Sequence, residues 1–263
     1  MITDRNILSP VIQGDGDRNH PYMSETGGAT ILVPVDVSSL PHLDADLVEL
    51  LSSLRIILLG YYPVPDQVAP EQLREEFEAN ASAQIESIAA DFVDRGGEVE
   101  PILVFTRDRG ASIDRIAIEY RCDAVLSLGE FAGISNILVP LRGDPNLKQI
   151  VYFIGELLPE TKAAVTLYHA ITPGEDGTES ELILRGVADR LREDGVAAER
   201  ITWLQSETDA PAKEIVRMAA DHDIVVIGES EPTLRKRILG DVPTRIIDQT
   251  GRPVLVVRST EDD

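Results

Sequence analysis

The sequence predicts an α/β protein built from two tandem, doubly wound parallel-sheet (Rossmann-like) domains, the first of which lacks its last helix and strand. Short β-branched runs alternate with helical patterns, as in sheets whose strands are joined by crossover helices. Residues 31–34 (Ile-Leu-Val-Pro) recur as residues 137–140, which indicates an internal repeat. Hydrophobic residues make up 43% and aromatic residues only 5%, so the core must be mainly aliphatic.

The first domain is predicted over residues 29–135, after an N-terminal arm (residues 1–28) without sustained periodicity that we expect to be flexible. Within 70–95, apolar residues spaced i, i+3, i+4 and i+7 form one helical stripe, and two glycines end it. The expected strands of this domain are residues 31–34, 55–62, 99–105 and 123–130, and its expected helices are residues 70–95 and 112–121.

The second domain is predicted over residues 136–260 and repeats this order of elements. Its expected strands are residues 137–140, 163–171, 201–205, 223–228 and 253–258, and its expected helices are residues 179–194, 212–222 and 242–249. Only residues 131–136 separate the fourth strand of the first domain from the second domain. The first domain has therefore lost its last helix and fifth strand.

The charge balance narrows the choice of partners. With 24 Lys and Arg against 46 Asp and Glu, the net charge of -22 would repel nucleic acid and anionic lipid.

No apolar run has the length of a membrane span and the N-terminus lacks a signal-peptide pattern, so we expect no membrane insertion and a cytoplasmic location. The single Cys122 excludes an internal disulfide framework. Such an acidic, lysine-poor composition also suits a salty cell interior.

The segment 223–258 carries the most specific pattern in the chain. An apolar strand ends in Gly228, a loop and the turn Ile-Leu-Gly (residues 238–240) follow, and a helix leads into Pro-Val-Leu-Val-Val-Arg (residues 253–258). Together with Leu-Tyr-His at 167–169, this resembles the universal stress protein family in its tandem form, over residues 29–260. The resemblance implies a sheet of order 3-2-1-4-5, pairing of subunits through fifth strands and, in some members, an ATP site between strands 1 and 4.

The family's ATP pattern is Gly, two residues, Gly, nine residues, Gly, then Ser or Thr, with a carboxylate at the end of strand 1. The nucleotide-binding candidates that this chain retains are Asp36, Gly129, Gly228 and Gly240. The second domain has Glu231 at the middle glycine and Asp241 in place of Ser or Thr, and both carboxylates would repel phosphates. Arg142 stands where the first domain has Asp36, although Asp144 lies two residues further on, and the basic residues 235–237 could offset the carboxylates. Because neither domain holds a complete set, we expect no cofactor, with ATP as the alternative.

No catalytic or metal-binding set is expected. The four histidines lack i+3 or i+4 partners, and there is no Gly-x-Ser-x-Gly elbow and no phosphate loop ending in Gly-Lys-Ser/Thr. Asp44, Asp46 and Glu49 could hold magnesium, but solvated carboxylates on a helix face are the commoner case.

The sequence thus predicts a non-enzymatic regulatory or interaction module with an unidentified protein partner. We expect a homodimer through the last strand (Val254, Leu255, Val256 and Val257), because only one half of the chain has a fifth strand. Residues 7–12 are expected to cover the open strand-4 edge of the first domain. One alternative is an ATP- or AMP-binding switch or weak ATPase at Asp36/Gly129 or Gly228/Gly240. A further alternative is a regulatory protein associated with a transporter, since the family occurs fused to such proteins.

Overall fold

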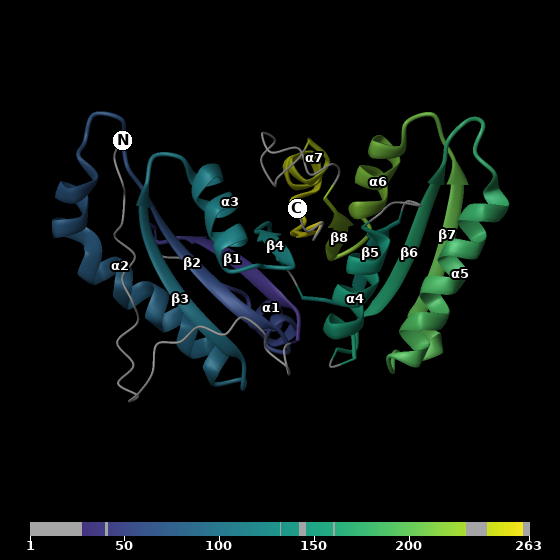
Figure 1. Cartoon of the computed structure of the whole chain (residues 1–263), viewed down its shortest axis with the longest axis horizontal. Coiled ribbons are helices and arrows are strands. Elements are labelled where there is room, and N and C mark those ends of the chain that lie inside the picture. Colours follow the sequence, from purple (N-terminus) through teal and green to yellow (C-terminus); the bar gives the residue numbers. More distant parts are fainter. Residues whose placement is uncertain are drawn as a thin grey trace.

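The computed structural model describes residues 28–39, 42–131, 133–141, 146–159, 161–229 and 241–259, without the side chain of Asp241. In these ranges nine strands form one continuous sheet of order β3-β2-β1-β4-β9-β8-β5-β6-β7 (Figure 1). The strands are β1 (Thr30–Asp36), β2 (Arg55–Pro63), β3 (Glu98–Thr106), β4 (Ala124–Ser127), β5 (Asn136–Pro140), β6 (Ala164–Ile171), β7 (Ile201–Glu207), β8 (Ile224–Gly228) and β9 (Val254–Val257). The helices are α1 (Ala45–Leu51), α2 (Pro70–Val93), α3 (Arg109–Glu119), α4 (Leu147–Leu157), α5 (Gly177–Glu193), α6 (Pro211–Ala219) and α7 (Asp241–Thr250), with one 3₁₀ turn, η1 (Ala198–Arg200).

The predicted α/β fold class is confirmed, and among the described residues of the first half no helix and no fifth strand follow β4. The first half contributes strands in the order 3-2-1-4, and the second half in the order 3-2-1-4-5. Strands within each half are parallel, as expected for strands joined by crossover helices. Helix α4 was not predicted, although its buried residues Ile150, Phe153, Ile154 and Leu157 follow the helical period.

Helices cover both faces of the sheet (Figure 1). One face packs against α1, α2, α4 and α5 in a core that includes Leu51, Phe92, Phe153 and Leu191. The other face packs against α3, α6 and α7 through residues such as Ile116, Ala219 and Ile246. Burial on both faces explains why most strands read as continuous aliphatic runs in the sequence.

Strand β9 joins the two halves. It pairs in parallel with β8 of its own half and antiparallel with β4 of the first half, where Ser127 lies opposite Val254 and Ala124 opposite Val257. The prediction that Val254–Val257 form a dimer interface is therefore wrong, because both edges of β9 already pair within the chain and all four side chains are buried. The same strand closes the β4 edge, and residues 7–12, expected to cover that edge, lie outside the described residues.

Equivalent aspartates hold the start of the first strand in each half. Asp123 Oδ2 accepts a hydrogen bond from the backbone N–H of Thr30 (2.7 Å). In the second half, Asp223 Oδ2 accepts from the backbone N–H groups of Ser135 (2.8 Å) and Asn136 (2.9 Å). The repeat therefore preserves a structural contact between the fourth and first strands as well as the strand pattern.

Candidate functional site

Each half has a point where strands 1 and 4 separate, which is where ligands bind in open α/β sheets. β1 and β4 pair only at Ile31–Ala124 and Leu32–Val125. β5 and β8 pair only at Ile137–Ile224 and Leu138–Val225. Gly129 follows the end of β4 beside the beginning of β9, whereas Gly228 lies opposite Val257 at its end. The candidate sites of the two halves therefore lie at opposite ends of β9.

Asp36 ends β1, as the sequence predicted, but its carboxylate is used locally. Its Oδ1 accepts from the backbone N–H of Ser38 (2.9 Å) and from the hydroxyl of the same residue (2.6 Å). Tyr61 lies opposite Asp36 in the register, and the guanidinium of Arg109 lies 5.1 Å from the Tyr61 ring centroid. Burial raises the pKa of Tyr61, while Arg109 lowers it and Asp36 raises it further. Asp36 therefore caps its own turn beside a cationic and aromatic pair.

Gly129 is packed against the segment that leads into β9. A Cβ built on Gly129 would lie 2.7 Å from the carbonyl carbon of Arg252 and from the nitrogen of Pro253, and closer still to the carbonyl oxygen of Gly251. The next residue, Glu130, donates its backbone N–H to that same oxygen (2.6 Å). The glycine predicted to admit phosphates thus admits the backbone of the second half, and the following amide is already bonded.

Gly228 in the second half is also closely packed against neighbouring side chains. A Cβ there would lie 2.8 Å from Ile150 Cδ1 and 3.4 Å from Asn146 Cβ. Asn146, only 4% exposed, precedes α4 and donates from Nδ2 to the carbonyl oxygen of Glu229. The backbone N–H of Glu229 bonds to the carbonyl oxygen of Val257 (2.7 Å), continuing the β8–β9 ladder.

A small cavity remains in the second half beside Gly228. Its volume is about 130 Å³, below the roughly 300–1,000 Å³ of typical small-molecule sites. Most of its lining is apolar, and it includes Tyr168, Ala212 and Ile215. Asn146 is the amide side chain in this lining, and its Oδ1 has no hydrogen-bond partner among the described residues.

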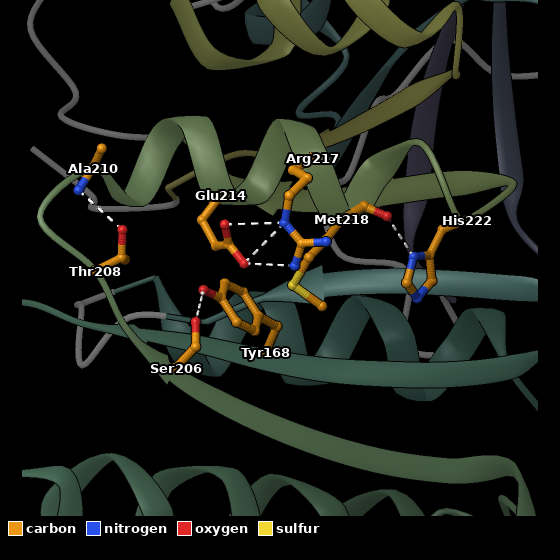
Figure 2. Close-up of polar contacts among 8 residues, drawn as sticks. All are labelled: Tyr168, Ser206, Thr208, Ala210, Glu214, Arg217, Met218 and His222. Atoms are coloured by element: carbon orange, nitrogen blue, oxygen red, sulfur yellow. Dashed lines mark hydrogen bonds and ion pairs between the residues drawn. The ribbon is translucent and has the colours of Figure 1, made fainter.

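Tyr168, which lines this cavity, belongs to a group of polar side chains from β6, β7 and α6 (Figure 2). Tyr168 and Ser206 share a hydrogen bond between their hydroxyl oxygens (2.7 Å), and burial raises the pKa of Tyr168. Glu214 accepts from Arg217 Nη2 (2.6 Å) and Nε, which lowers the pKa of this carboxyl group. Each of these groups already has a partner in the chain. The first of these contacts links β6 to β7, and the second lies within α6.

Several positions that the sequence singled out lie outside the residues that the structure describes. These are Gly240, Arg142, Asp144, Glu231, residues 235–237 and the side chain of Asp241. The structure therefore places Asp36, Gly129 and Gly228 of the four nucleotide candidates, and it does not bring the first two together with the third.

Of the acidic residues near the first strand, Asp44 has a structural role. Asp44 is the N-cap of α1, and its side chain accepts from the backbone N–H of Asp46 (2.9 Å). Within the described ranges no group of three or more His, Cys, Asp or Glu side chains could hold a metal ion. Nor is any helix in the same ranges long and apolar enough to cross a bilayer.

Sequence reasoning missed two residues that shape these sites, Asn146 and Gly251. Asn146 precedes an apolar helical stripe, which is a usable N-cap signal. Gly251 has a φ of 69°, a left-handed conformation that favours glycine after a helix, and the position after residues 242–249 would have suggested it. Its contact with Glu130 has no signal in the sequence, because the two residues come from different halves.

Comparisons with known proteins identify the class. Residues 133–258 match the model of the universal stress protein family. A universal stress protein structure from Archaeoglobus fulgidus DSM 4304 is 13% identical, with a TM-score of 0.62 over 90% of this chain and 98% of that chain. A protein of unknown function from Pseudomonas aeruginosa PAO1 is 17% identical, with a TM-score of 0.54 over 87% of this chain and 92% of that chain. No curated protein matches the chain.

The two solved structures establish a shared fold that spans both halves of the chain. The family model extends from the residues just before β5 to the end of β9. The C-terminal half of the chain, residues 133–258, carries the sequence pattern of the universal stress protein family. The predicted resemblance is confirmed.

Proposed function

We propose that this chain is a non-catalytic, cytoplasmic universal stress module that acts by binding a protein partner. In this proposal, the nucleotide position of the first half, at Gly129, packs against the second half and holds the two halves together. The observation that supports this function most strongly is the packing of Gly129 against residues 251–253. Backbone of the second half fills the space beside Gly129 where a Cβ would lie, and the N–H of the next residue, Glu130, is already hydrogen-bonded.

The absence of an activated side chain supports the non-catalytic part of the proposal. Burial raises the pKa of the Cys122 thiol to about 12, so it is a poor nucleophile. Asp36, Tyr168 and Glu214 are each hydrogen-bonded to a neighbour within the chain. No side chain described here combines exposure, a free base and a nucleophile as acyl or phosphoryl transfer requires.

The test is the nucleotide content of the purified protein. We expect acid extraction followed by mass spectrometry to recover less than one nucleotide per ten chains, and incubation with Mg-ATP to release no phosphate above the buffer rate. Stoichiometric ATP or AMP in the extract would refute the proposal.

A nucleotide-dependent switch in the second half is the second candidate function. The cavity beside Gly228 favours it, since it lies where strands β5 and β8 separate. Ala212→Phe would fill that cavity, whereas Asp36→Asn alters only the first half. Recovered nucleotide that disappears in Ala212→Phe and persists in Asp36→Asn would establish the second candidate and reject the first.

A further inference from the structure

Helices α4 and α5, together with Ser53 of the first half, line an open groove of about 890 Å³. From α4 it is lined by Val151 and Tyr152, and from α5 by Leu182 and Ile183. Tyr152 is 45% exposed and Leu182 is 67% exposed, and both are among the few large apolar side chains with such exposure in the described ranges. Apolar surface of this kind commonly marks a contact site.

Glycine in the middle of α5 adds a second observation. A Cβ built on Gly186 would meet no atom within 4 Å, so neither the fold nor the neighbouring helix requires glycine here. Glycine is unfavourable inside a helix, and it is useful where another backbone approaches closely. Gly186 lines the same groove. The helix is therefore suited to receive an extended segment across this point.

The chain itself supplies a segment at this groove. The description begins at Gly28, and a Cβ there would lie 3.2 Å from Glu156 Oε2 and 3.9 Å from the carbonyl oxygen of Ser53. Glu156 and Ser53 both line the groove. The 27 residues that precede Gly28 thus join the described chain at the edge of the apolar surface.

That segment has suitable chemistry and length. Four of the residues at 7–12 are apolar: Ile7, Leu8, Val11 and Ile12. From Gly28 back to Ile12 the chain can span roughly 50 Å when extended, about three times the roughly 16 Å length of α4. Because β9 closes the β4 edge, these apolar residues are not needed there.

We infer that residues 7–12 bind the groove between α4 and α5. The groove is then an intramolecular docking site. This inference goes beyond the proposed function and does not depend on whether nucleotide binds.

Hydrogen exchange of the full-length chain, read by mass spectrometry, tests the inference. We expect amides of residues 7–12 to exchange at least tenfold more slowly in the wild type than in Leu182→Ser or Gly186→Leu. Ile118→Ser on α3 is the matched control, since Ile118 is 63% exposed and lies away from the groove. It should leave the exchange unchanged.

The results of this experiment distinguish residues 7–12 from a second copy of the chain as the occupant of the groove. Equal exchange in the wild type and both groove variants would overturn the inference, as would protection that Ile118→Ser also removes. Protection that increases with protein concentration, together with a dimer in sedimentation, would assign the groove to a second copy and would equally overturn it.

Discussion

Gly129 and Gly251 lie against each other at the junction of the two halves, where the Gly251 carbonyl accepts the hydrogen bond from the residue after Gly129. Gly129→Ala should lower the free energy of unfolding by about 3 kcal/mol, because the added methyl group overlaps backbone atoms that cannot rotate away. Gly177→Ala is the matched control, because the atom nearest to its Cβ is the flexible end of the Ile171 side chain (3.2 Å), and it should change stability by less than about 1 kcal/mol. Urea denaturation of the two variants measures both effects, and equal stabilities would contradict the junction.

Leu255 is the second residue of β9 and is fully buried between β4 and β8. Leu255→Glu should destabilise the fold by about 4 kcal/mol or more, because an unpaired carboxylate would be buried. Leu204→Glu on the edge strand β7, where Leu204 is 46% exposed, should change stability by less than about 1 kcal/mol. Circular dichroism during urea titration gives both values. A well-folded Leu255→Glu monomer, as expected for a lost dimer contact, would contradict the intramolecular pairing.

Arg258 fastens the end of β9 to the first half. Its Nη1 donates to the carbonyl oxygens of Ala117 (2.9 Å) and Cys122 (3.3 Å), and its backbone N–H donates to the carbonyl oxygen of Asp123. Arg258→Met should cost about 1.5–3 kcal/mol, the usual value for hydrogen bonds with a charged group. Arg115→Met, which removes an exposed pair with Glu119, should cost under about 0.5 kcal/mol. Similar losses for both variants in thermal unfolding would contradict the anchoring role.

Cys122 makes the stability sensitive to alkaline pH. Burial raises the pKa of its thiol from 9.0 to about 12, so above pH 9 the unfolded chain loses a proton that the folded chain keeps. Its contribution to stability is therefore complete below pH 9 and is lost as the pH rises towards 12. We expect stability to fall more steeply from pH 9 to 11 in the wild type than in Cys122→Ala. Parallel curves in urea titrations at these pH values would rule out this linkage.

The strands and the repeat could be predicted because a strand buried on both faces leaves an unbroken aliphatic run, whatever its partner. The strand with which β9 pairs could not be predicted. The apolar residues of β9 match a central strand equally well in a homodimer and in a single chain, and only the fold shows that β4 occupies the second edge.

The candidate site was predictable only as positions along the chain. Asp36, Gly129 and Gly228 lie at strand ends, as expected, because glycine and aspartate after an aliphatic run end a strand. Their use was not predictable, since a glycine that admits phosphate and one that admits backbone look the same in sequence. Glycine is required at position 129 because the backbone of residues 251–253, more than a hundred positions away, packs against it.

Equilibrium unfolding with and without millimolar Mg-ATP tests the central claim that the nucleotide positions have become structural. A ligand present at a hundredfold excess over its dissociation constant would stabilise the folded chain by about 2.7 kcal/mol. We predict no change in the free energy of unfolding or in the melting temperature. A stabilisation of this size that persists in Ala212→Phe and is lost in Asp36→Asn would place ATP in the first half and contradict the account.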